Sequence, residues 1–237
     1  MMKRVLVITP VKDSWETTLQ TIEGLYTSTL PFAYIVYNDF SKKDTRQKLI
    51  EASEQYGFTL VHLDEITQNP SPNYKLILQM AQKEAMRLRM PLLIVESDVV
   101  VAPTTLKELV AMGNRLPNAG MVGSVTVDES GRFNFPYATV KSTGKGIGET
   151  RKSLSFCATL ITLSFLERYN FGELSANKDW FDIHISRQSR RLGFKNYLSK
   201  RTPVLHQPHS SRPWKQLKYT HPLQYYWYKI IRKRDRI

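Results

Sequence analysis

The stretch Pro91-Leu-Leu-Ile-Val-Glu-Ser-Asp98 joins an apolar run to a short acidic cluster. The uninterrupted apolar run predicts a buried strand, and ligands of open α/β sheets bind beyond the carboxyl ends of such strands. Glu96, Ser97 and Asp98 follow at that position. Carboxylates suit hard cations such as Mg²⁺ and Mn²⁺. The stretch therefore predicts a divalent cation holding a diphosphate. A surface turn after a core strand is the alternative for the cluster taken alone.

The bulk composition is that of an ordinary globular protein. The chain has 237 residues, 41% of them hydrophobic, which is enough for one large domain or two tightly associated halves. The single cysteine, Cys157, excludes an intrachain disulfide framework and a thiolate metal cluster, and it favours a reducing, cytoplasmic setting. The N-terminal apolar run is far shorter than the roughly 18 residues that span a bilayer, so we interpret it as a first strand rather than a signal peptide.

The formal net charge of +13 draws the chain toward phosphate groups of some kind. Nucleic acid, anionic lipid and phosphorylated small molecules all carry such groups. The basic residues concentrate in the last fifty or so positions, from Arg187 to Arg236. This asymmetry predicts that an anionic partner meets the C-terminal end.

The first hundred residues alternate strand-like and helix-like patterns, which predicts a mostly parallel sheet with helices on both faces. Gly57 is typical of a helix C-cap and Ser14 of an N-cap. The expected strands are 4–9, 33–37, 58–63 and 92–95, and the expected helices are 14–26, 44–56 and 73–88, with a fourth opening at Pro103.

The pattern is less regular beyond that helix. We expect strands at 121–126, 132–137, 194–198 and 204–206, a core element at 153–163, a helix at 179–192 and a mobile glycine-rich loop at 141–150. No linker divides the chain. The prediction is one globule over 1–210, with halves 1–100 and 101–210, followed by a basic aromatic tail at 211–237.

Four further features complete a known pattern. They are Ile8-Thr-Pro-Val11, Tyr37-Asn-Asp-Phe-Ser-Lys-Lys-Asp-Thr45, the helix Asp182-Ile-His-Ile-Ser-Arg-Gln-Ser-Arg-Arg-Leu-Gly-Phe-Lys195 and Val204-Leu-His206. With Glu96-Ser-Asp98 they resemble glycosyltransferase family 2 from about Val5 to His206. The resemblance implies the GT-A fold, a Rossmann-like mostly parallel sheet flanked by helices with a smaller mixed C-terminal part. It also implies a nucleotide-diphosphate sugar donor.

The resemblance assigns nucleotide contacts to the first half of the chain. The stretch from Tyr37 is similar to the family's V-D-D-x-S-x-D-x-T, with Asp39 on the second acidic position and Asn38 in place of the first. Lys75 lies where the family has a basic residue, so it is expected at the diphosphate, or else as a solvated lysine. The implied nucleotide-binding residues are Thr9, Pro10, Val11, Asn38, Asp39, Lys75 and Ser97.

The resemblance also supplies the metal and the base. Glu96-Ser-Asp98 is similar to the family's D-x-D motif, and His206 to a late histidine that binds the metal, so Glu96, Asp98 and His206 are the expected ligands of Mn²⁺ or Mg²⁺. His209 and His221 are the alternatives. Asp182 matches the catalytic Asp of E-D-x-D and is the expected general base. Asp179 is the second choice, and an ordinary amphipathic surface helix is the alternative for the segment.

The family inverts the anomeric centre, and its processive members carry Q-x-x-R-W and spanning helices, which are not evident here. We therefore expect one sugar to be added per acceptor, a saccharide or lipid-linked saccharide. The tail interleaves aromatic and basic residues, from Tyr219 to Ile237. It predicts peripheral contact of a cytoplasmic protein with an anionic membrane surface, while packing on the body or stacking on single-stranded nucleic acid are alternatives.

Two other functions are weighed against this one. A nucleotide-sugar pyrophosphorylase carries a glycine-rich loop after its first strand, and Thr9-Pro-Val-Lys-Asp-Ser14 has no glycine. A non-catalytic module that binds nucleic acid or membrane accounts for the charge but leaves Asp98 and Asp182 without a role. We therefore expect no nucleic-acid partner.

Overall fold

The structure, a computed structural model, describes residues 4–140, 146–175, 180–207, 222–223 and 226–227. Its helices are α1 (Trp15–Tyr26), α2 (Lys43–Tyr56), α3 (Tyr74–Leu88), α4 (Thr105–Arg115), α5 (Leu163–Leu166) and α6 (Phe181–Arg191), with short 3-10 turns η1 (Leu63–Glu65) and η2 (Phe171–Glu173). Its strands are β1 (Leu6–Val11), β2 (Ala33–Asn38), β3 (Thr59–His62), β4 (Leu92–Val95), β5 (Val99–Val100), β6 (Ala119–Val127), β7 (Ile147–Glu149), β8 (Ala158–Ile161) and β9 (Lys195–His206).

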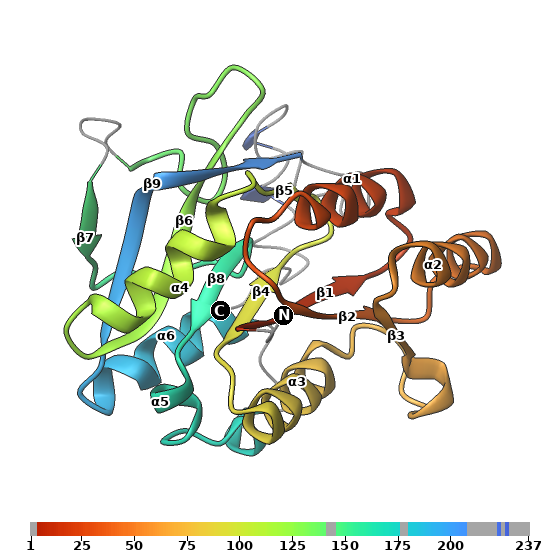
Figure 1. The fold of residues 1–237 in the computed structure, drawn as a ribbon, viewed down its shortest axis with the longest axis horizontal. Helices are drawn as coiled ribbons and strands as arrows, with labels where there is room; N and C mark the ends of the chain where they lie inside the picture. Colours follow the sequence, from red (N-terminus) through yellow and green to blue (C-terminus); the bar gives the residue numbers. More distant parts are fainter. Residues whose placement is uncertain (1–3, 141–145, 176–179, 208–221, 224–225, 228–237) are drawn as a thin grey trace.

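The described strands form one mixed sheet in the order β3-β2-β1-β4-β8-β6-β9-β5, and β7 pairs with β9 (Figure 1). Strands β1 to β4 are mutually parallel where they pair, and β8 runs antiparallel between β4 and β6. The α/β prediction with a mixed C-terminal part is therefore confirmed. Because β1, β2 and β4 are parallel, their carboxyl ends meet at one edge of the sheet.

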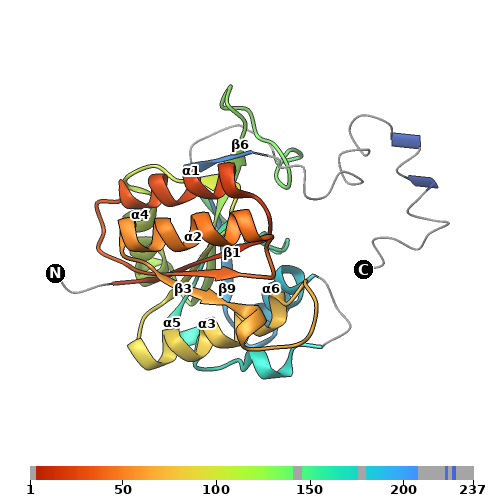
Figure 2. The ribbon, with the colours of Figure 1, turned by 90° about the vertical axis from the view of Figure 1, so that its right-hand side faces the viewer.

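Helices α1, α2 and α4 lie on one face of the sheet and α3, α5 and α6 on the other (Figure 2). Each face has its own apolar core. Val7 and Leu93 belong to the first core, whereas their neighbours Ile8 and Ile94 belong to the second. Successive residues of a strand point to opposite faces, so a strand between two helical layers must be apolar throughout. This requirement explains the unbroken apolar run before Glu96.

The caps and boundaries of the first half follow the sequence prediction closely. Gly57 ends α2 in the left-handed conformation with φ of 72°, which glycine adopts without strain. Ser14 precedes α1 but does not cap it by its side chain, because its hydroxyl donates to the Lys12 carbonyl instead. The helix predicted at 179–192 is α6, and its first predicted residue, Asp179, lies outside the described residues.

Three predictions for the second half are wrong in detail. The strand expected at 132–137 is a single bridge between Val127 and Phe133, because the chain reverses at Asp128 and Pro136 has no N–H for a ladder. The strands expected at 194–198 and 204–206 are one strand, β9. The end of the glycine-rich loop forms β7, and residues 141–145 of that loop lie outside the described residues.

Within the described ranges, no helix is both long enough and apolar enough to cross a bilayer. Nearly all of the tail at 211–237, with His209 and His221, falls outside those ranges. The membrane prediction therefore has no structural counterpart here.

Helix α6 is fixed to β9 by buried polar groups. The Ser189 hydroxyl donates to Asn196 Oδ1 at 2.7 Å, and Asn196 Nδ2 donates to the Ser186 carbonyl at 2.9 Å. The Ser186 hydroxyl accepts from the Leu154 backbone at 3.0 Å. All three polar side chains are fully buried. They set the position of the helix that carries Asp182.

Replacing Asn196 by Ala should lower the free energy of unfolding by about 1–3 kcal/mol, because it leaves buried polar groups of Ser186 and Ser189 without partners. Chemical denaturation measures this change. Asn114→Ala makes the same replacement at an exposed position of α4 and should change stability by no more than about 0.5 kcal/mol. Equal effects of the two substitutions would contradict the role assigned to the network.

Candidate active site

The acidic cluster lies at the carboxyl end of β4, in the middle of the sheet. The Glu96 N–H donates to the Cys157 carbonyl at 3.1 Å, so the β4–β8 ladder continues one step past the strand. Val99 then pairs with His206, and the Asp98 carbonyl accepts from the Gln207 N–H at 2.8 Å. The end of β9 is thereby held against residues 96–98. Backbone pairing on both sides fixes the cluster on rigid elements.

His206 contacts the second carboxylate of the cluster. Its Nε2 lies 3.4 Å from Asp98 Oδ2, and each residue is only 8% exposed. Burial disfavours the imidazolium, but the hydrogen bond to Asp98 and the charges of Asp98 and Glu96 outweigh it and raise the pKa of His206. The Phe135 backbone also contributes to raising the pKa of His206. The Phe135 ring lies beside the imidazole, with ring centroids 6.4 Å apart, and Asn134 Nδ2 donates to the His206 carbonyl at 2.9 Å, so neighbouring residues pack around His206.

Glu96 shares the same buried space. Burial and the charge of Asp98 raise the pKa of Glu96 to about 7, and Asp182 adds to the shift, whereas His206 and Cys157 oppose it. The charge of Asp182 reaches Tyr137 as well and raises the pKa of that phenol, for which burial is the main cause. Asp182 is therefore electrostatically coupled to the β4 cluster. The structure brings together residues that the sequence separates widely.

Cys157 is a site residue that the sequence analysis missed. Its thiol donates to Glu96 Oε2 at 3.3 Å and contacts the Ser155 hydroxyl at 3.3 Å. Ligand atoms of Glu96, Cys157 and His206 all lie within 4.8 Å of one another. Burial and the charge of Glu96 raise the pKa of the thiol well above its usual value. In the sequence, Cys157 is marked only by its position directly before the run Ala158–Ile161. The structure shows that this run is β8 and that it pairs with β4.

Asp182 occupies the first turn of α6 and is half-buried. Its Oδ1 accepts from the Ile183 N–H at 2.8 Å. A carboxylate is favoured in the first turn because the helix dipole and the free N–H groups attract negative charge. The helix thus carries a carboxylate in its first turn at low cost in stability.

The side chains of the expected nucleotide motif form hydrogen bonds to other residues of the protein. Asp39 accepts hydrogen bonds from the Ser71 hydroxyl at 2.7 Å, the Asn73 N–H at 2.9 Å and Asn73 Nδ2 at 2.8 Å. Asn38 Nδ2 contacts His62 Nδ1 at 2.9 Å, and its Oδ1 accepts from the Ser41 N–H at 3.1 Å. Both residues are buried. They connect the end of β2 to the start of α3, so the structure gives them a framing role.

The remaining predicted contacts lie along the same edge. The Thr9 hydroxyl is buried and accepts from the Tyr34 hydroxyl at 2.9 Å, while the Val11 carbonyl accepts from the Asp39 N–H at 2.9 Å. Pro10, between them, is partly buried. Ser97 is buried in the turn between Glu96 and Asp98. The 9–11 stretch therefore shapes the edge through its backbone.

Lys75 lies in the first turn of α3, which contains no acidic residue. A cation at a helix N-terminus is unfavourable for the helix dipole, so helix stability does not account for this lysine. The N-terminus and the lysine together form an anion-binding arrangement. Asn73, the residue before helix α3, is hydrogen-bonded to Asp39, which fixes the N-terminus of the helix that carries Lys75 at the edge formed by the end of β2.

An aromatic row connects these parts. Tyr74 lies between Phe156 and Phe181, with ring centroids 6.1 Å and 6.3 Å away and planes within 8° and 6°. In the chain, Tyr74 comes directly before Lys75, Phe156 directly before Cys157, and Phe181 directly before Asp182. Movement of any one ring would displace a polar group of the site.

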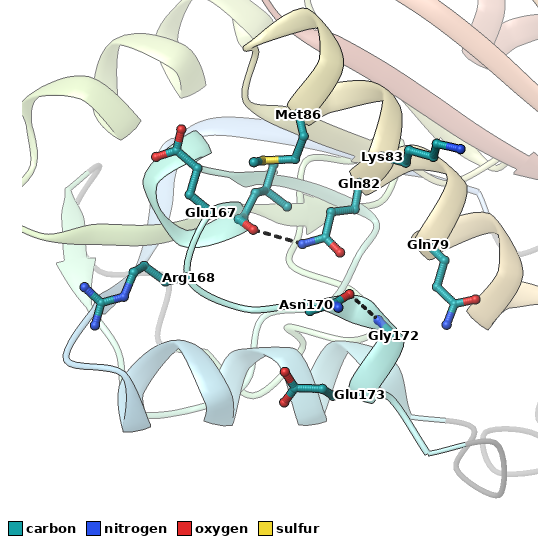
Figure 3. A pocket seen from close by; sticks show the side chains of 10 residues that line it. Gln79, Gln82, Lys83, Met86, Glu167, Arg168, Asn170, Gly172 and Glu173 are labelled. Atoms are coloured by element: carbon teal, nitrogen blue, oxygen red, sulfur yellow. Dashed lines mark hydrogen bonds between the residues drawn. The ribbon is translucent and has the colours of Figure 1, made fainter.

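A separate hollow of about 480 Å³ lies between α3 and residues 166–173 (Figure 3). Figure 3 shows Gln82 reaching from α3 to this segment, where its Nε2 donates to the carbonyls of Leu166 and Tyr169 and its Oε1 accepts from the Phe171 N–H. None of the predicted site residues lines it. The amide holds the segment in place, so the hollow is a consequence of packing.

Comparisons with known proteins agree with this geometry. Residues 6–172, more than half of the chain, match the family described as Glycosyl transferase family 2. No curated protein matches the chain in sequence at a significant level.

Three solved structures share its fold at low sequence identity. The mannosyltransferase PcManGT from Pyrobaculum calidifontis, in complex with GDP-Man and Mn²⁺, has a TM-score of 0.66 at 17% identity over 97% of this chain and 65% of its own. GalNAc-T7 with UDP, GalNAc and Mn²⁺ has a TM-score of 0.60 at 14% identity, and the match covers 86% of this chain and 44% of its own. S. aureus TarS 1–349 has a TM-score of 0.62 at 16% identity, and the match covers 86% of this chain and 60% of its own. The chain thus spans less than two thirds of each structure.

Replacing Asp39 by Asn should lower the free energy of unfolding by about 1–3 kcal/mol, because an amide cannot accept three hydrogen bonds from Ser71 and Asn73. Asp128→Asn is the matched control, since Asp128 also accepts three hydrogen bonds, from Ser130 and Arg132, but lies in an exposed turn. Its effect on denaturation should stay below about 1 kcal/mol. Unchanged stability of Asp39→Asn would show that Asp39 does not frame the site.

Proposed function

This chain belongs to glycosyl transferase family 2, and we propose that it transfers one sugar from a nucleotide-diphosphate donor to a saccharide or lipid-linked saccharide, with inversion. The observation that carries the proposal is the placement of Glu96, Asp98 and His206 together at the carboxyl end of β4, with His206 Nε2 3.4 Å from Asp98 Oδ2. We assign the metal-binding groups to this edge of the sheet and the proton-accepting group to Asp182, whose charge adds to the raised pKa of Glu96. The two solved structures described with Mn²⁺ and a nucleotide or nucleotide sugar support the choice of donor class.

The donor set suits a divalent cation. Carboxylate oxygens of Glu96 and Asp98 with the imidazole of His206 are ligands that Mn²⁺ accepts, and Mg²⁺ accepts the carboxylates. When bound, such an ion neutralises the diphosphate and makes it a better leaving group. His206 would serve as a ligand in its neutral form, so binding of an ion would compete with protonation of the imidazole.

The protein's own groups perform the remaining tasks. Lys75 and the α3 N-terminus stabilise the negative charge of the diphosphate. Asn38 and Asp39 hold the wall beside the nucleoside, with Ser97 and the backbone of 9–11 along the same edge. Asp182 accepts the proton of the acceptor hydroxyl as that oxygen attacks the anomeric carbon opposite the departing diphosphate. A single displacement of this kind inverts the anomeric centre.

In this arrangement residues 1–100 hold the donor and residues 101–210 hold the acceptor. The basic and aromatic tail at 211–237 would contact an anionic membrane surface, which suits a lipid-linked acceptor. The other base considered from the sequence, Asp179, lies outside the described residues.

Asp182→Asn should lower kcat by roughly 100- to 10,000-fold, the range for loss of a general base, while donor affinity is retained. Turnover of a nucleotide-sugar panel with Mn²⁺ measures the first effect, and calorimetric donor binding measures the second. Glu54→Gln, at an exposed position of α2, controls for the loss of one carboxylate charge. A folded Asp182→Asn enzyme with full kcat would overturn the assignment.

A matching nucleotide diphosphate at about one hundred times its Kd should stabilise the protein by about 2.7 kcal/mol, which corresponds to roughly 5–10 °C in Tm at this chain length. The measurement is a thermal-shift panel of UDP, GDP and their sugars with and without Mn²⁺. Asp98→Asn should lose the Mn²⁺-dependent part of the shift relative to its own ligand-free Tm. The proposal fails if no nucleotide or nucleotide sugar raises the Tm of the unaltered protein.

A further inference from the structure

Cys157 lies where a ligand of the proposed cation would lie. It is 1% exposed, and its sulfur is 3.3 Å from Glu96 Oε2. Sulfur, carboxylate oxygen and imidazole nitrogen of Cys157, Glu96 and His206 are all within 4.8 Å of one another. The cluster therefore contains three different kinds of metal ligand around one point.

The distances allow a shared ion. Metal bonds of about 2.3 Å to sulfur and 2.0–2.1 Å to nitrogen or oxygen place tetrahedral ligand atoms about 3.3–3.6 Å apart. The Cys157 and Glu96 atoms already meet that spacing, as do the His206 and Asp98 atoms at 3.4 Å. Small side-chain rotations would close the remaining separations.

The surrounding structure holds these ligands in place. The Glu96 N–H bonds the Cys157 carbonyl, and Val95 faces Ala158 in the register of β4 and β8, so the two side chains start from adjacent backbone positions. His206 is held by its neighbours: Asn134 Nδ2 donates to the His206 carbonyl at 2.9 Å, and the Phe135 ring packs near the imidazole with centroids 6.4 Å apart.

We infer that Cys157 is a ligand of the divalent cation at this site, together with Glu96 and His206, and that the site prefers borderline cations such as Co²⁺ and Zn²⁺ to Mg²⁺. The inference rests on the metal site of the proposed function and extends it. Thiolate ligands favour Zn²⁺-like ions, whereas oxygen-only sites favour Mg²⁺ and Mn²⁺. On binding, the sulfur–hydrogen bond breaks, the proton passes to solvent, and the sulfur lone pair bonds the ion.

The test is anaerobic titration of the metal-free full-length protein with Co²⁺, followed by absorption spectroscopy. Thiolate bound to Co²⁺ gives an intense near-ultraviolet charge-transfer band, distinct from the weak visible bands of any bound Co²⁺. Cys157 is the only cysteine in the chain, so such a band can come from no other residue. The spectrum of the unaltered protein therefore answers the question even if a variant fails to fold.

Cys157→Ser should abolish the charge-transfer band and weaken Co²⁺ and Zn²⁺ binding by at least the roughly 10- to 100-fold that loss of an outer-shell partner costs. Ser155→Ala is the matched control, because Ser155 touches the same sulfur at 3.3 Å but is not a proposed ligand. It should retain the band. Mn²⁺ affinity should change much less than Zn²⁺ affinity in Cys157→Ser.

Two results would overturn the inference. Visible Co²⁺ bands without a charge-transfer band would show that the ion binds without sulfur, and the proposed sugar transfer would stand unaffected. Absence of all Co²⁺ bands would reject the mixed-ligand site altogether. A nucleotide-sugar thermal shift with Mn²⁺, measured on the same preparation, separates either result from failure of the proposed function.

Discussion

The contact between His206 and Asp98 is the constraint on which the rest of the site depends. It joins the last described strand to the end of the central strand, and it does so at the point where negative charge gathers. Glu96 and Asp98 lie together at this point, and burial and the charge of Asp98 raise the pKa of Glu96. Neighbouring carboxylates are stabilised when positive charge or hydrogen-bond donors lie among them. The Cys157 thiol donates to Glu96, and Asp98 raises the pKa of His206, which favours a proton on the imidazole.

The long strand β9 makes this contact geometrically achievable. It runs parallel to β6 along most of its length and then pairs through its last residues with β5, directly after the acidic cluster. A register shift lies between Ser124 and Thr126, and beyond it β9 pairs with β6 on one edge and with β5 on the other. Irregularities of this kind bend a strand and redirect a side chain, and they are common next to active sites.

Much of the first half could be predicted because its signals are local. Apolar runs, helical periodicity and Gly57 each specify structure within a few residues, and the resulting strands pair in the order that parallel crossovers favour. The second half depends on contacts that local patterns do not encode. The stretch at 132–137 has the aromatic residues of a strand, yet the turn at Asp128 and Pro136 limit its pairing to a single bridge between Val127 and Phe133. Basic residues and Pro203 divide a pattern that the structure shows to be a single strand.

The residues of the candidate site also divide into those with a local sequence signal and those placed by distant contacts. Glu96, Asp98 and Asp182 could be found from motif order, because each follows a strand end or opens a helix. Cys157 could not, since its contact with Glu96 arises from the antiparallel register of β4 and β8, which is set by packing of the whole sheet. Asp39 could be found from its motif, but its hydrogen bonds to Ser71 and Asn73 could not, and its contact with a nucleotide stays a prediction.

The framing role of Asp39 explains how the two halves of the site stay aligned. Its three hydrogen bonds fix Asn73, and the next residue, Tyr74, lies in the aromatic row between Phe156 and Phe181. Phe156 precedes Cys157, and Phe181 precedes Asp182. A displacement at the nucleotide edge is therefore transmitted through packed rings to the metal ligands and to the base, since close-packed interiors transmit strain. This packing joins the start of α3, the start of β8 and the first turn of α6, so the proposed donor-side frame and the proposed base belong to one packed unit.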